Sequence, residues 1–184
     1  MAHPFSRLSR RAQRHALVIL GVLTFALTTF LAVLGSPLQT PAAPSGIVSL
    51  ELAGSAAAAR EILDSWSPYQ RDLARLGLWI DFLYLVSYPL FLALACARLA
   101  DRVAGRAPRW ARAGEVLAWA LPLAGLLDAV ENSALLRVLG SGASDAAAGL
   151  ARACALPKFA LVLAALAYLA LGLGWMWRTR PGRR

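Results

Sequence analysis

Two acids and an amide stand close together inside one of the apolar stretches of this sequence. The segment LLDAVENSALL (126–136) carries Asp128, Glu131 and Asn132. Residues three and four apart lie on the same side of a helix, so all three share one face with Leu135. Lys158, the only lysine in the chain, lies in a second apolar stretch. Side chains of these types can bind a cation, exchange a proton or pair with one another.

Two further segments carry polar groups that can join this set. Asp81 is followed at helical spacing by Tyr84 and Tyr88, and Glu51 interrupts the apolar run IVSLELAG. Counted from the ends of their segments, Glu131 and Lys158 both lie about nine residues deep, or roughly 13 Å. The sequence therefore predicts one cluster. Its candidate proton-exchange or ligand-binding residues are Asp81, Asp128, Glu131, Asn132 and Lys158, with Tyr84, Tyr88 and Glu51 in support.

The charges of this cluster do not balance. Ionised groups near the middle of a membrane cost at least ~2.5–3.5 kcal/mol each, so they are expected to face one another and not lipid. Lys158 can neutralise only one of the three acids Asp81, Asp128 and Glu131. Burial and like charge both disfavour the ionised form of a carboxyl group. We therefore expect at least one of the acids to keep its proton near neutral pH.

The same residues also permit a purely structural interpretation. A lysine paired with two acids can fix the register of packed helices, with Asn132 and the tyrosine hydroxyls completing the hydrogen bonds. Tyr84 and Tyr88 can be packing residues, and Glu51 can be a solvated or interfacial acid instead of a lid over a cavity. The sequence leaves both interpretations open.

The composition is typical of a membrane protein. Of the 184 residues, 59% are hydrophobic, and the mean hydropathy is +0.57. A helix of about 20 apolar residues spans the roughly 30 Å hydrocarbon layer of a bilayer. Four segments meet this requirement, at 16–35, 76–98, 116–138 and 153–176. We therefore predict an all-α fold, a four-helix transmembrane bundle that forms a single membrane domain over residues 1–184.

The first of these segments follows a basic stretch, as the apolar core of a signal peptide does. A signal-peptide core has about 7–15 residues. The run ALVILGVLTFALTTFLAVLG is longer and carries no charge, so we expect an uncleaved first helix.

The basic residues indicate the orientation of the bundle. Of the 19 Lys and Arg residues, 13 lie before the first span, between the second and third, or after the fourth. They are Arg7, Arg10, Arg11, Arg14, Arg98, Arg102, Arg106, Arg109, Arg112, Arg178, Arg180, Arg183 and Arg184. Short basic loops favour the cytoplasmic side, which predicts a multi-pass protein of the cell (inner) membrane with both termini in the cytoplasm. No aromatic and basic platform accompanies the arginines, so nucleic acid is not an expected partner.

Residues 36–67 are expected to lie on the outer side. The stretch SPLQTPAAPSG (36–46) is predicted to be a linker, and Ser55 is predicted to be the N-cap of a short amphipathic helix over about 56–66. The apolar face of that helix carries Ala59, Ile62, Leu63 and Trp66. It can cap the bundle or rest on lipid.

Prolines mark the start and the interior of the later helices. Ser67-Pro68 is a favourable helix start, and the helix that follows is predicted to run to about residue 103. Pro89, Pro122 and Pro157 are expected to interrupt the three spans that carry the polar cluster.

Four short motifs suggest a relationship. LELAG (50–54), IDFLY (80–84), LLDAVEN (126–132) and PKF (157–159) resemble a group of small four-span bacterial integral membrane proteins, over roughly residues 47–170. The resemblance implies the four-span topology and a bacterial origin, but no reaction. The plan of four spans with buried acids is also similar, in topology only, to that of the emopamil-binding-protein-like sterol isomerases.

Three functions are compatible with these residues. The first is a small binding or transport module in which a cavity takes an amphipathic or cationic molecule and the acidic and lysine cluster exchanges protons. The second is a membrane-embedded lipid or isoprenoid enzyme of the isomerase type, with Asp128 or Glu131 as the general acid and base. The third is a non-catalytic accessory subunit, with a homo-oligomer or a membrane partner. His3 and His15 flank the first span, and neither a metal nor a cofactor is expected.

Overall fold

The computed structural model describes residues 3–178, and every regular element among them is helical. In chain order these elements are α1 (Arg10–Gly35), the short 3₁₀ helix η1 (Ser36–Leu38), α2 (Ile47–Glu51), α3 (Ala56–Ser65), α4 (Pro68–Val103), α5 (Pro108–Ser141) and α6 (Asp145–Arg178). Arg178 ends α6, whereas Arg180, Arg183 and Arg184 of the expected basic tail lie outside the described residues. The predicted all-helical fold is confirmed for the described chain.

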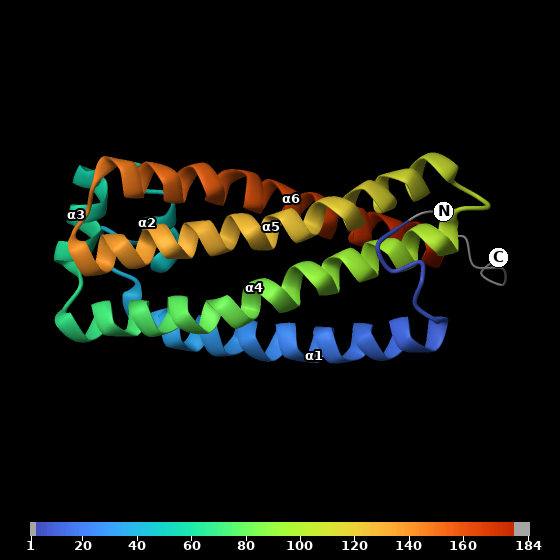
Figure 1. Cartoon of the computed structure of the whole chain (residues 1–184), viewed down its shortest axis with the longest axis horizontal. Helices are drawn as coiled ribbons and strands as arrows, with labels where there is room; N and C mark the ends of the chain where they lie inside the picture. The colour runs from blue at the N-terminus through green and yellow to red at the C-terminus, as the bar shows by residue number, and fades with distance from the viewer. Residues whose placement is uncertain (1–2, 179–184) are drawn as a thin grey trace.

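Four of the helices, α1, α4, α5 and α6, are long and apolar enough to cross a membrane, in agreement with the four predicted segments. They lie side by side and alternate in direction (Figure 1). The start of α1, the α4–α5 connection and the end of α6 lie at one end of the bundle. The α5–α6 connection and the two short helices α2 and α3 lie at the other end.

The four long helices do not contribute equally to the core. Helices α4, α5 and α6 pack against one another, whereas α1 packs chiefly against α4. The most apolar part of α1 has no buried residue, and Phe25 on it is 75% exposed. A helix surface this apolar is stable when lipid or another apolar surface covers it.

Helix α3 covers one end of the bundle. Ser55 accepts a hydrogen bond from the Ala58 backbone N–H as N-cap, as the sequence predicts. The predicted apolar face, Ala59, Ile62, Leu63 and Trp66, is buried in a core shared with residues of α4, α5 and α6. The indole N–H of Trp66 donates to the Leu38 carbonyl at 2.8 Å, which ties α3 to η1. The sequence predicts that this helix either caps the bundle or rests on lipid, and in the structure it caps the bundle.

Helix α4 begins and ends where the sequence predicts. Pro68 occupies its first turn, and the Ser67 and Gln70 side chains each accept a hydrogen bond from the other residue's backbone N–H. This reciprocal cap satisfies amide groups that otherwise lack a helical partner. The helix then continues to Val103.

The predicted interruptions at Pro89, Pro122 and Pro157 are not observed, because each proline lies inside an unbroken helix. Pro89 has no N–H to donate to the Leu85 carbonyl four residues earlier. Gly125 of α5 faces this carbonyl, and a Cβ atom at Gly125 would stand 2.6 Å from Leu85 O and 3.1 Å from Pro89 Cγ. The missing side chain therefore allows α4 and α5 to approach closely at the proline.

This close approach predicts the effect of Gly125→Ala. The added methyl group has to push α4 and α5 apart, and we expect a loss of about 1–3 kcal/mol in the free energy of unfolding. The measurement is the thermal melting temperature of the purified protein in detergent. Gly140→Ala in the same helix is the matched control, because nothing lies within 4 Å of a Cβ there. Equal melting temperatures for the two variants would contradict this account.

Candidate functional site

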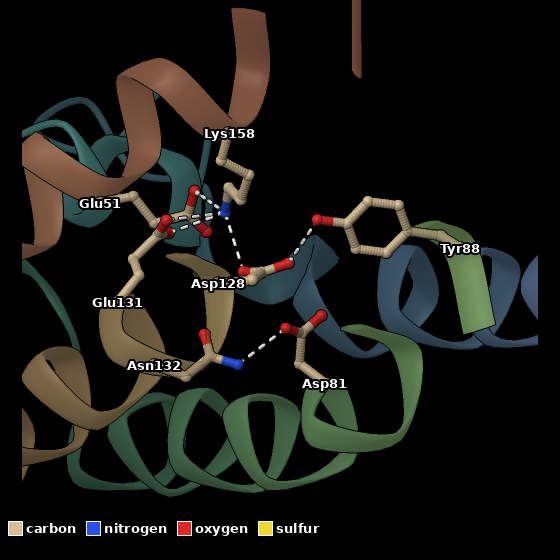
Figure 2. A network of polar contacts seen from close by, with 7 residues as sticks. All are labelled: Glu51, Asp81, Tyr88, Asp128, Glu131, Asn132 and Lys158. Atoms are coloured by element: carbon tan, nitrogen blue, oxygen red, sulfur yellow. Dashed lines mark hydrogen bonds and ion pairs between the residues drawn. The ribbon is translucent and has the colours of Figure 1, made fainter. Parts of the chain in front are cut away.

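The structure brings the polar residues of four helices together around Lys158. Lys158 comes from α6, Asp128, Glu131 and Asn132 from α5, Asp81, Tyr84 and Tyr88 from α4, and Glu51 from α2. Figure 2 shows the Lys158 side chain reaching from α6 into the space between Glu51, Glu131 and Asp128.

The ammonium group of Lys158 contacts three carboxyl groups. Its Nζ atom lies 3.0 Å from Asp128 Oδ1, 2.9 Å from each Glu131 oxygen and 3.6 Å from Glu51 Oε2. All four residues are buried, with Lys158 itself 6% exposed and Glu131 0% exposed. A cation withdrawn from water in this way is stable only if acceptors surround it, and these carboxyl groups are those acceptors.

Two more hydrogen bonds extend the network. The Tyr88 hydroxyl donates to Asp128 Oδ2 at 2.9 Å, so Asp128 lies between the tyrosine and the lysine. The Asn132 amide donates to Asp81 Oδ2 at 2.7 Å, which links α5 to α4 (Figure 2). We call these seven residues, Glu51, Asp81, Tyr88, Asp128, Glu131, Asn132 and Lys158, the acidic cluster.

Local helix geometry accounts for the placement of the cluster residues that α4 and α5 carry. Asp128, Glu131 and Asn132 lie on one face of α5 at spacings of three and four residues, and all are buried. Asp81 and Tyr88 lie two turns apart on α4 and reach different members of that face. The rest of the arrangement depends on how α2 and α6 are placed, which helix periodicity does not determine.

Glu51 occupies a more central position than a solvated acid would. It ends the short helix α2, is 8% exposed and faces Lys158. Just after it, Gly54 has φ of +71°, and a Cβ atom there would lie 2.7 Å from Arg152 Cδ of α6. This glycine lets the chain turn tightly against α6, with Glu51 held above the lysine. The burial of Glu51 contradicts its interpretation as a solvated acid.

Tyr84 differs from the other predicted members. Its ring lies 4.9 Å from that of Tyr88, but its hydroxyl accepts a hydrogen bond from Thr28 of α1 at 3.2 Å and bonds none of the acids in the described chain. Neither Thr28 nor Phe159 is predicted from the sequence as a neighbour of the cluster, although the Phe159 ring lies 4.7 Å from Lys158 Nζ. The position of Phe159 next to the single lysine was the one available signal for the second of these.

The acidic cluster holds more negative than positive groups. Glu51, Asp128 and Glu131 contact the one ammonium group and Asp81 is linked to them through Asn132, so four ionised carboxyls would leave a formal charge of −3. Glu51 Oε2 and Glu131 Oε2 are also buried and accept no hydrogen bond from the described residues, so they contact Lys158 only as ion pairs. A site of this kind favours the retention of protons or the binding of a further cation.

Two cavities reach the acidic cluster. The larger, about 200 Å³, is lined by Val48, Glu51, Asp81, Tyr84, Tyr88, Asp128, Lys158, Phe159 and Val162. The smaller, about 80 Å³, lies between α1, α2 and α4 and reaches Glu51, Asp81 and Asn132. Glu131 lines neither cavity. Within residues 3–178, no three His, Cys, Asp or Glu side chains are grouped so as to hold a metal ion.

The contacts of Lys158 predict the effect of removing its charge. Lys158→Met leaves buried carboxyl groups without a cation, and breaking such a pair costs about 3–5 kcal/mol. Protonation of the carboxyls relieves their repulsion, so the lost stability should return as the pH falls and disappear again as it rises. The measurement is thermal melting in detergent across pH. Arg137→Met, at an exposed position of α5, is the control and should show neither effect. A pH-independent loss in Lys158→Met would contradict the charge imbalance.

No known protein family, curated protein or solved structure matches the chain. The resemblance carried by the four short motifs therefore stays a prediction, and a function has to be argued from the geometry of the acidic cluster.

Proposed function

We propose that this protein is a small membrane module that binds or transports an amphipathic organic cation in exchange for protons. The observation that carries the proposal is the surplus of carboxyl groups over the single lysine, at the wall of a cavity. A bound organic cation and a proton each neutralise one of the surplus carboxylates, so the two compete for the same groups.

The acids divide into two kinds by their position. Glu131 lies outside both cavities and has both oxygens 2.9 Å from Lys158 Nζ, so it acts as the fixed counterion of the lysine. Glu51, Asp81 and Asp128 line the larger cavity. These three are the groups that a ligand reaches, and exchange is assigned to them.

The aromatic residues of the cavity fit an ammonium group. Tyr84 and Tyr88 form a close tilted pair on the wall that also carries Asp81. Cations, and quaternary ammonium groups in particular, bind favourably to the faces of aromatic rings. Phe159 already contacts the Lys158 ammonium group, so the tyrosine pair is the aromatic surface left for a ligand.

The size and place of the cavity suggest which part of a ligand it holds. Its volume of about 200 Å³ is below the roughly 300–1,000 Å³ of drug-sized ligand pockets. Its α4 and α6 residues come from the middle of those helices. A cationic head group fits inside, while an apolar tail extends between α4 and α6 into the acyl chains.

The orientation in the membrane belongs to the same proposal. The start of α1 and the α4–α5 connection share one end of the bundle (Figure 1), and the arginines at 98–112 lie there. By the positive-inside rule, this end faces the cytoplasm and the protein resides in the cell membrane. The acidic cluster, nearer to α2 and α3, then lies in the outer half, and α3 caps the bundle from outside.

One observation favours a second candidate, a lipid or isoprenoid isomerase. Tyr88, Asp128 and Lys158 form a continuous chain of acid and base groups along the cavity wall. Such a chain can deliver a proton at one position of a double bond and remove one at another. The small cavity volume argues against it, because the reacting part of a lipid has to lie inside. Conversion of an isoprenoid by the purified protein would establish this candidate instead.

The binding proposal is tested with hexyltrimethylammonium, whose permanent charge ensures that any released proton comes from the protein. We expect calorimetric titration to show saturable binding that strengthens as pH rises, with heats that depend on the buffer because protons are released. Asp81→Asn removes a carboxylate that faces the ligand, and we expect it to weaken binding about tenfold and reduce proton release.

Glu115→Gln is the matched control, because Glu115 lies in α5 but lines neither cavity. It should bind hexyltrimethylammonium as the wild type does. The proposal fails if the wild type does not bind the probe, or if Asp81→Asn and Glu115→Gln release the same number of protons as the wild type.

A further inference from the structure

A second charged pocket lies at the opposite end of the bundle from α2 and α3, where α1 begins and α4 ends. It has a volume of about 180 Å³ and is lined by Arg10 and Gln13 of α1 and by Arg98, Asp101 and Arg102 of α4. We call it the arginine pocket. None of its residues belongs to the acidic cluster or lines either of that cluster's cavities.

The N-terminal segment holds the two walls of the arginine pocket together. Gln13 is buried, and its side-chain amide donates to the Phe5 and Leu8 carbonyls at 3.0 and 3.1 Å. His3 is also buried, and its Nε2 atom lies 3.4 Å from Asp101 Oδ2 of α4. The segment before α1 thus folds back across the bundle end (Figure 1) and fixes α1 against α4. The sequence predicts only that His3 flanks the first span, and it does not predict this contact with Asp101.

The charges in the arginine pocket are strongly one-sided. Three guanidinium groups line it, and the single acid on its wall, Asp101, already pairs with His3. Arg98 also lies within electrostatic reach of Arg14, in addition to Arg10 and Arg102. These like charges repel one another, so an anion placed between them would lower the energy of all of them.

Arg98 supplies a donor that points to the same conclusion. Its Nη1 atom is buried and has no hydrogen-bond partner among the described residues. Leaving a buried charged donor unpaired costs more than leaving a neutral one. The one carboxylate on the pocket wall, Asp101, pairs with His3 and accepts no hydrogen bond from this Arg98 nitrogen. A ligand that enters the pocket can supply the acceptor.

We propose that the arginine pocket binds the phosphate group of an anionic ligand. The planar fork of a guanidinium group matches two phosphate oxygens, and several such forks can share one phosphate. Arg98 lies about one turn before the end of α4, a depth at which phospholipid head groups meet the helices of a membrane protein. A lipid phosphodiester and a free phosphate both have this chemistry. The proposal does not depend on the function assigned to the acidic cluster.

The experiment uses the full-length protein, stripped of lipid in detergent, and two probes. Phosphatidylglycerol binding is followed by native mass spectrometry, and inorganic phosphate binding by calorimetry. We expect saturable binding of at least one probe and about tenfold weaker binding in Arg98→Gln, which loses a charge-assisted hydrogen bond. Binding of the lipid alone identifies a head-group site, and binding of inorganic phosphate alone identifies a site for a soluble anion.

Arg109→Gln is the matched control, because Arg109 is an exposed arginine at the same bundle end that does not line the pocket. It should bind as the wild type does. Equal weakening in Arg98→Gln and Arg109→Gln would overturn the proposal, because it would indicate only general charge attraction. The proposal would also be overturned if neither probe showed saturable binding. If Arg98→Gln does not fold, Arg98→Lys against Arg109→Lys gives the same comparison. Weaker binding in the first variant alone supports the proposal, and equal binding overturns it.

Discussion

The ammonium group of Lys158 cannot stay inside an apolar bundle unless carboxyl groups meet it there, and the arrangement of this protein depends on that constraint. Asp128 and Glu131 meet it from α5, which fixes the register of α5 against α6. Glu51 meets it from α2, which draws the short helix and the turn at Gly54 onto the bundle. Breaking a buried pair costs far more than the pair contributes over an apolar alternative, so such a lysine constrains the fold more than it stabilises it.

The close packing of α4 on α5 serves the same cluster. Gly125 lies one turn before Asp128, and Pro89 directly follows Tyr88. The contact that needs a glycine at 125 therefore lies next to the hydrogen bond from Tyr88 to Asp128. A wider spacing of the two helices would lengthen that bond and the one from Asn132 to Asp81. The close packing at Gly125 and the hydrogen bonds between α4 and α5 therefore depend on the same short distance between these two helices.

Much of this was predictable from the sequence, and the parts that were not have a common cause. Hydrophobic length identified the four long helices, and helical periodicity placed Asp128, Glu131 and Asn132 on one face. Depth counted from the segment ends paired Glu131 with Lys158. Helical periodicity does not predict the path of the chain between the helices. The burial of Glu51, the bond from Thr28 to Tyr84 and the fold-back of His3 onto Asp101 all depend on that path. At Pro89 the unbroken helix was not predicted because Gly125 of the neighbouring helix, and not the local sequence, leaves room for the free carbonyl.

The geometry of the acidic cluster argues against register fixing as its only role. An ion pair that only fixes helix register needs one carboxylate for one ammonium group. Glu131 can be that carboxylate, because both its oxygens contact Lys158 and it lies outside both cavities. The same ammonium group cannot also neutralise the other three carboxyl groups, Glu51, Asp81 and Asp128, and all three lie on the cavity wall. A network that only fixed helix register would gain nothing from surplus acids, because each one costs free energy inside a membrane. Their concentration at a cavity wall, beside a pair of aromatic rings, is what supports the proposed cation site.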